Sequence, residues 1–139
     1  MALSREKLLH QLDQEELVDW APELKNGKEA YEFLTTVLGK GTLSVNQTRN
    51  GLHALFRIRT HGNNTEVLRR FLELATHPDL EIRSKAVQLA IGLVRYTLMT
   101  DVVGVSPIML SEDQREVLRN ALAAGLTPRV TEIAREFLE

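Results

Sequence analysis

One stretch constrains the fold more than any other part of the chain. Residues 79–99, DLEIRSKAVQLAIGLVRYTLM, contain no proline and are long enough for about six turns of helix. At about 100° per residue, one narrow stripe collects the side chains suited to water, which are Glu81, Lys85, Gln88, Gly92, Arg95 and Met99. The remaining circumference is mostly apolar, and such a helix needs neighbours on several sides. The sequence therefore predicts a central helix enclosed by other helices.

Helix signals recur along the rest of the chain. A capping residue followed three positions later by Glu or Gln occurs at Asn26/Glu29, Ser44/Gln47 and Ser111/Gln114. Thr127-Pro128 is expected to cap and begin the last helix. Aromatic residues make up 5% of the chain and prolines number four, which favours an all-helical domain of ordinary size at 139 residues. The absence of cysteine excludes thiol catalysis and cysteine-ligated zinc.

An internal repeat organises these helices. EVLRRFLELATHP at 66–78 matches EVLRNALAAGLTP at 116–128, an offset of 50, and a second helix is expected after each proline. A shift of 35 residues places the apolar positions of 87–93 on those of 52–58. We therefore predict one domain over 1–139, whose parts are an N-terminal helical cap (1–25), three helix pairs (27–61, 64–99 and 111–139) and an apolar loop between the last two pairs (101–110).

The middle pair resembles the HEAT-repeat family of armadillo/HEAT-type α-solenoids. The matching residues are Pro78, Asp79, Ile82, Arg83, Ala86 and Leu89. This resemblance implies a right-handed α-α superhelix in which Asp79 and Arg83 belong to a structural ladder between repeats. It also implies that the second, or B, helices line a concave surface that binds partners. The last pair departs from the family pattern, because Thr131 replaces the arginine and no aspartate follows Pro128.

A basic stripe is the most suggestive polar feature. In the helix expected over 45–61, Arg49, His53, Arg57 and His61 recur every four residues. Under the 35-residue correspondence, this stripe continues the polar stripe of the central helix. It fits a local site for acidic side chains, a C-terminus or phosphates, and it equally fits a solvated face that makes helix pairs with nearby acids. The two histidines lie two turns apart without a third ligand at suitable spacing, so we expect no metal.

The leading functional hypothesis is a non-catalytic adaptor that binds a protein through the B-helix surface. Its expected partner-binding residues are Arg49, His53, Arg57, Lys85, Gln88 and Arg95. Binding of a nucleic-acid phosphate backbone is the alternative, although a net charge of -2 gives it no global electrostatic support. A solenoid enzyme is third, because no spacing indicates a catalytic constellation, and no cofactor is expected.

The loop at 101–110 is unusually apolar. Its residues Val103, Ile108, Met109 and Leu110 form a secondary interface candidate, or else the loop folds back over the groove between the second and third pairs. The chain closes on Phe137-Leu138-Glu139 without a polar capping helix, which suggests self-association, a partner or a longer solenoid. With no secretory signal pattern and no apolar run long enough for a bilayer, we expect a cytoplasmic protein that does not bind membranes.

Overall fold

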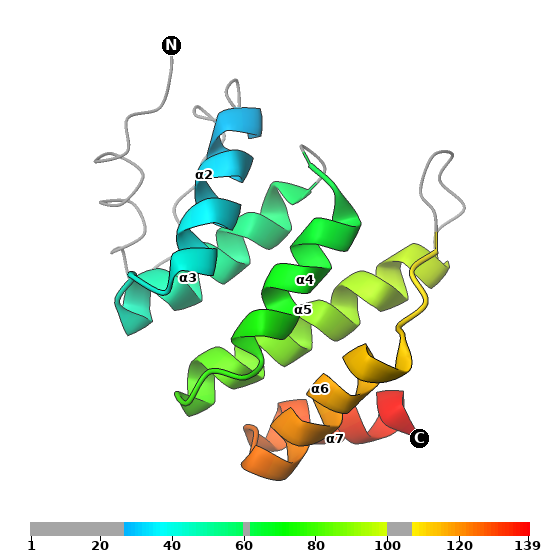
Figure 1. Ribbon diagram of the computed structural model, residues 1–139. Helices are drawn as coiled ribbons and strands as arrows, with labels where there is room; N and C mark the ends of the chain where they lie inside the picture. Colours follow the sequence, from blue (N-terminus) through cyan, green and yellow to red (C-terminus); the bar gives the residue numbers. More distant parts are fainter. Residues whose placement is uncertain (1–26, 60–61, 100–106) are drawn as a thin grey trace. The chain divides into compact units, whose positions relative to one another are not determined.

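The computed structural model describes residues 27–59, 62–99 and 107–139 (Figure 1). Regular secondary structure within these residues is helical throughout, with no strand, which confirms the predicted all-α class. The helices are α2 (Gly27–Lys40), α3 (Val45–Arg57), α4 (Asn64–Leu74), α5 (Leu80–Met99), α6 (Glu112–Ala124) and α7 (Pro128–Leu138). The N-terminal cap expected over 1–25 and the capping residue Asn26 lie outside the described residues.

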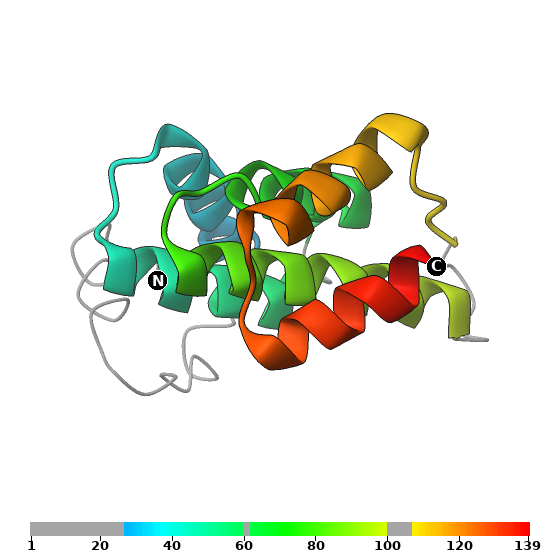
Figure 2. The same cartoon turned by 90° about the horizontal axis from the view of Figure 1, so that it is seen from below.

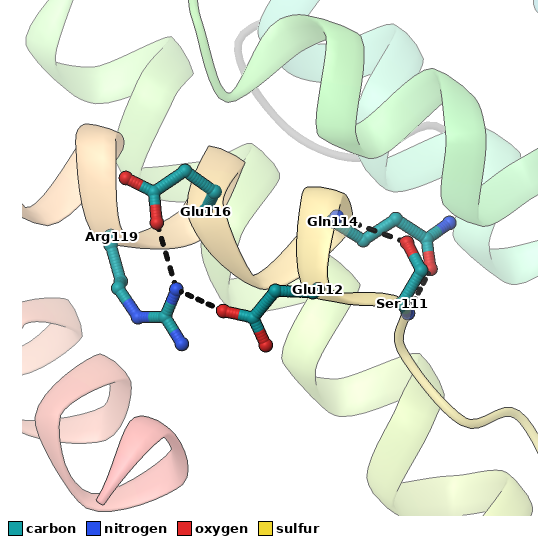
Figure 3. A network of polar contacts seen from close by, with 5 residues as sticks. All are labelled: Ser111, Glu112, Gln114, Glu116 and Arg119. Atoms are coloured by element: carbon teal, nitrogen blue, oxygen red, sulfur yellow. Dashed lines mark hydrogen bonds and ion pairs between the residues drawn. The ribbon is translucent and has the colours of Figure 1, made fainter.

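Two capping boxes begin helices where the sequence predicts them. At α3, the Ser44 hydroxyl accepts the Gln47 backbone N–H at 3.1 Å, and Gln47 Oε1 accepts the Ser44 N–H at 3.1 Å. At α6, Ser111 and Gln114 make the same reciprocal pair at 3.1 and 2.9 Å, as Figure 3 shows. Each pair satisfies backbone N–H groups that an exposed helix start would otherwise leave without partners.

α7 begins where the sequence predicts, but its cap differs from the expected one. Thr127 occupies the N-cap position and Pro128 the first turn, but the Thr127 side chain makes no capping hydrogen bond. Its backbone N–H instead donates to the hydroxyl of Ser84 on α5 at 2.9 Å. The start of α7 is therefore held by a tertiary contact, which the local sequence pattern could not reveal.

Two glycines end helices by adopting positive φ angles. Gly41 follows α2 with a φ of 68°, and Gly125 follows α6 with a φ of 109°. Only glycine adopts such angles without strain, because it has no Cβ. The N–H of Gly125 turns back to the carbonyls of Ala121 and Leu122, at 3.1 and 3.2 Å. The chain can therefore reverse direction between α6 and α7 within a short turn.

The chain divides into two compact units, Met1–Arg70 and Phe71–Glu139, with the boundary inside α4. In the first unit α2 packs against α3. The buried apolar side chains of this unit are Ala30, Tyr31, Leu34, Val37, Leu38, Leu52, Ala54, Leu55, Ile58, Val67 and Leu68. They recur at three- and four-residue intervals along each helix, as expected for amphipathic helices around a shared core.

Tyr31 anchors α2 to the start of α4 within the first unit. Its side chain is only 6% exposed, and a Cβ on Gly62 would lie 2.0 Å from its Cζ, so the ring lies directly against that glycine. The Tyr31 hydroxyl accepts the Asn63 N–H at 3.3 Å and donates to Glu66 Oε1 at 3.1 Å. Burial, opposed by the Asn63 contact and reinforced by Glu66, raises the pKa of Tyr31 above 10.0.

Arg70 forms a second link between the same helices. Its Nε donates to the carbonyl of Thr35 at 2.7 Å. A Cβ on Gly39 would lie 2.7 Å from the Arg70 Cζ, so the glycine leaves room for the guanidinium at the end of α2. A cation is well placed there, because a helix C-terminus carries partial negative charge and carbonyls without intrahelical partners.

The second unit is built on α5. Both α6 and α7 pack against α5 and against each other, and Figures 1 and 2 show them joined by a short turn. The buried apolar side chains of this unit are Phe71, Leu72, Ala75, Ile82, Ala86, Val87, Leu89, Ala90, Ile91, Leu93, Val94, Leu118, Ala121, Val130 and Ala134. The long helix supplies most of them, as its apolar circumference predicts.

Candidate functional site

The polar stripe of α5 is accessible to water, and so are two apolar residues outside it near the ends of the helix, Leu80 and Leu98, which are 46% and 50% exposed. Eleven of its twenty residues are buried, including Arg83, Ser84 and Thr97. Lys85, Gln88, Gly92 and Arg95 are half-buried, and Glu81 and Met99 are exposed at the two ends of the helix. We name these six residues the α5 stripe. The predicted exposure of this stripe is confirmed, and three of the expected partner-binding residues lie on it.

Arg95 is held in place by an aromatic ring from α7. Its guanidinium carbon lies 5.6 Å from the centroid of the Phe137 ring, within the range of a cation–π interaction. One turn before Arg95 on the stripe, Gly92 has open space where a side chain would begin, with no atom within 4 Å of an added Cβ. The stripe therefore combines an oriented cation with an open position beside it.

Arg83 lies outside the stripe and has a structural role. It is 9% exposed, and its Nε donates to the carbonyl of Gly125 at 2.8 Å. Its Nη1 donates to the carbonyls of His77 and Pro78, each at 3.0 Å, in the turn that precedes α5. A buried guanidinium is tolerable because these carbonyls satisfy its donors. Asp79 serves the same turn, since its Oδ1 accepts the Ile82 N–H at 3.0 Å and caps α5.

Ser84 is a structural residue that the sequence did not single out. Its hydroxyl accepts the Thr127 N–H, and its side chain is only 3% exposed. It adjoins Arg83, so two consecutive residues of α5 bind the turn between α6 and α7. Arg83 and Ser84 are polar residues that fall outside the polar stripe of the helix, and this position was the available signal.

In the first unit, α3 presents the second group of expected partner-binding residues. Arg49 and His53 are half-buried, and Arg57 is exposed in the last turn. The Arg49 guanidinium donates to Asn46 Oδ1 at 2.6 Å, an uncharged acceptor on the same helix. We name Arg49, His53 and Arg57 the α3 basic face. The fourth member of the predicted stripe, His61, lies outside the described residues.

Arg59 does not extend the α3 basic face. Its guanidinium carbon lies 4.3 Å from the centroid of the Phe56 ring, and its Nη1 donates to the Phe56 carbonyl at 2.8 Å. α3 ends at Arg57, and Ile58 forms its C-cap. Arg59 therefore folds back over the last turn of the helix, where its charge meets helix carbonyls.

The described end of the apolar loop is attached to α5. The N–H of Ile108 donates to the hydroxyl of Thr97 at 3.0 Å, and Thr97 is buried. Ile108 and Leu110 are half-buried, whereas Met109 is 76% exposed. Val103 lies outside the described residues. Of the four residues of the secondary interface candidate, Met109 is thus the one that the structure leaves most open to contact.

The outer surface of α6 carries a polar network with a local role. Arg119 Nη1 lies 2.8 Å from both Glu112 Oε1 and Glu116 Oε2, as Figure 3 shows. The hydrogen bonds that Arg119 donates to Glu112 and then to Glu116 raise the pKa of Arg119. The acids lie in the first half of the helix, where they complement the helix dipole. This network is exposed, and we assign it to α6 itself instead of to recognition.

Within the described ranges, no group of three or more His, Asp or Glu side chains is arranged to hold a metal ion. No helix in the described part of the chain combines the length and apolarity needed to cross a bilayer. No family model, curated protein or solved structure matches this chain. Two candidate surfaces are therefore defined, each by its own geometry: the α3 basic face in the first unit and the α5 stripe in the second.

Proposed function

We propose that the chain is a non-catalytic adaptor that binds a protein partner. The residues proposed to carry binding are Lys85, Gln88 and Arg95 of the α5 stripe, together with Arg49, His53 and Arg57 of the α3 basic face. The observation that supports this proposal most directly is the exposure pattern of α5. A helix buried over most of its circumference keeps one polar row accessible, and that row contains a lysine, an amide and an arginine.

The stripe has properties that lower the cost of recognition. Half-buried lysine and arginine side chains can lay their aliphatic stems on the protein while their charged heads meet a partner. Because Phe137 already orients Arg95, the Arg95 side chain loses less conformational entropy on binding. Along the stripe, Gly92 lies between Gln88 and Arg95, and the open space at Gly92 can accept a side chain of the partner.

A HEAT-like right-handed superhelix of three helix pairs is part of the same proposal. It is supported by the two sequence offsets and by the Pro78, Asp79 and Arg83 pattern of the middle pair. In such a stack each repeat contacts its neighbours, and the second helices line an extended concave surface suited to protein partners.

Affinity capture with the whole chain as bait, followed by identification of the captured proteins by mass spectrometry, tests this proposal. Arg95→Glu is expected to weaken capture of a specific partner at least about tenfold, because it reverses the charge of the oriented cation in the stripe. Arg129→Glu is the matched control, since Arg129 is exposed at the start of α7, outside both binding groups. It should leave capture unchanged.

The double variant Arg57→Glu/Arg95→Glu should abolish capture. Undiminished capture by this variant would reject binding through these residues. If capture then disappears on Met109→Glu, the interface lies at the exposed end of the apolar loop. Circular dichroism of each variant verifies that the helices remain folded.

A further inference from the structure

Charge is distributed unevenly along the chain. Acidic residues make up about one residue in seven, yet none occurs between Glu32 and Glu66. The same segment contains Lys40, Arg49, Arg57 and Arg59, in addition to two histidines. α3 falls entirely within this segment. α3 therefore carries basic side chains and no acidic ones.

The α3 basic face has a regular geometry. Arg49, His53 and Arg57 are four residues apart, so successive positions advance by about 6 Å along the helix and the row extends over about 12 Å. The guanidinium of Arg49 is positioned by Asn46, and Arg57 is exposed. Phe56 is half-buried next to Arg57, and its ring contacts the guanidinium of Arg59.

We propose that the α3 basic face binds an acidic helical segment of the protein partner, with Asp or Glu side chains recurring every four residues. Such a helix has carboxylates at the same intervals of about 6 Å, so each can meet one basic group when the two helices lie side by side. The planar guanidinium groups at both ends of the row suit carboxylates, which they bind in a bidentate manner. This inference rests on the proposed function and names the chemistry of its partner.

The size of the face favours a protein helix over nucleic acid. Proteins that bind duplex DNA commonly contact about six to ten phosphates. The α3 basic face has three groups in one short row, fewer than such a set of phosphate contacts requires. A row of three carboxylates needs no larger basic surface than α3 provides.

Fluorescence anisotropy with defined probes tests the inference. The first probe is a labelled peptide of about 20 residues, long enough for an isolated helix, with Glu at every fourth position of an Ala- and Gln-rich sequence. The second probe is a peptide of the same composition in which the glutamates are distributed around the whole helix. A single-stranded oligonucleotide and a duplex of similar length form the third set. We expect the periodic peptide to bind several-fold more tightly than every other probe at physiological ionic strength.

Matched variants assign the binding to α3. Arg49→Gln/Arg57→Gln is expected to weaken binding of the periodic peptide about tenfold, from the loss of two charged contacts. Lys40→Gln/Arg69→Gln removes the same charge from two exposed positions outside α3 and should change binding less than about twofold. If the double α3 variant loses helical signal, Arg57→Gln alone, at an exposed position, provides the comparison.

Equal binding of both peptides, equal loss in the two double variants or tighter binding of an oligonucleotide would overturn the inference. Its failure is distinguishable from failure of the proposed function. Capture of a protein that depends on Arg95 of the α5 stripe would support the adaptor function even if the periodic peptide did not bind α3.

Discussion

The Nε atom of Arg83 and the carbonyl oxygen of Gly125 lie 2.8 Å apart, although 42 residues separate them in the sequence. The same guanidinium donates through Nη1 to the carbonyls of His77 and Pro78. One buried cation thus joins the turn that begins α5 to the turn that ends α6. Hydrogen bonds from a charged donor such as this guanidinium contribute more to stability than neutral ones.

Replacing Arg83 with methionine should lower the free energy of unfolding by about 2–4 kcal/mol, because carbonyls in both turns lose a charged donor. Urea denaturation followed by circular dichroism measures the change. Arg135→Met, at an exposed position on α7, is the control and should change stability by less than about 0.5 kcal/mol. Similar values for the two variants would contradict the structural role of Arg83.

The helix caps should differ in their energetic importance. Ser44→Ala and Ser111→Ala each remove a side-chain acceptor from a complete capping box and should cost about 1 kcal/mol. Thr127→Ala should cost at most a few tenths of a kcal/mol, because the Thr127 side chain makes no capping hydrogen bond. Unfolding midpoints in urea compare the three variants. A cost for Thr127→Ala as large as that of the two serine variants would refute this ranking.

Two glycine substitutions should have opposite effects. A Cβ on Gly62 would lie 2.0 Å from the buried Tyr31 ring, so Gly62→Ala should destabilise the fold by about 1–3 kcal/mol. Gly92 is in the middle of α5 with open space around the added Cβ, and Gly92→Ala should stabilise by about 0.5–1 kcal/mol. Thermal and urea unfolding measure both. A neutral Gly62→Ala variant would show that the ring does not occupy this position.

Stability should fall in strongly alkaline solution because of Tyr31. Burial raises the pKa of its hydroxyl above the unfolded value of 10.0, so the folded protein retains the proton at pH values where the unfolded chain releases it. The stabilising contribution is therefore complete below about pH 10 and is lost as pH rises through the folded pKa. Tyr31→Phe should reduce this alkaline loss in urea unfolding.

A spectroscopic titration tests the same point directly. The chain has two tyrosines, so Tyr31 is the only phenol that remains in a Tyr96→Phe variant. Its absorbance should titrate with a midpoint above 10.0 in the folded protein. A midpoint at or below that of the urea-unfolded variant would contradict the buried position of the hydroxyl.

The features that the sequence predicted correctly are local or periodic. The capping boxes at Ser44 and Ser111 depend on residues three positions apart, and the exposure of the α5 stripe follows from helical periodicity alone. The expected beginnings and ends of the described helices differ from the observed ones by only a few residues. For the candidate site, the stripe's exposure was predictable, whereas the contact that orients Arg95 was not.

The remaining contacts join residues that only the tertiary structure brings together. Tyr31 meets Glu66 and Arg70 meets Thr35, each across 35 residues, which equals one of the repeat offsets in the sequence. That offset predicted equivalent helices but not which side chains meet. Thr127 shows the reverse case. It is a suitable capping residue at the N-cap position, but its side chain makes no capping hydrogen bond. Its backbone N–H donates to the hydroxyl of Ser84, a contact that the local sequence does not predict.

The attachment of α6 to α5 at both of its ends has a dynamic consequence. Ile108, shortly before α6, is hydrogen-bonded to Thr97 near the C-terminal end of α5. The turn after α6 is hydrogen-bonded to Arg83 and Ser84 near the N-terminal end of α5. A hairpin held at one end can open like a hinge, whereas α6 must break contacts at both ends before it leaves α5. Backbone amides of α6 should therefore exchange with solvent only in openings that also release the turn leading into α7, as one cooperative unit.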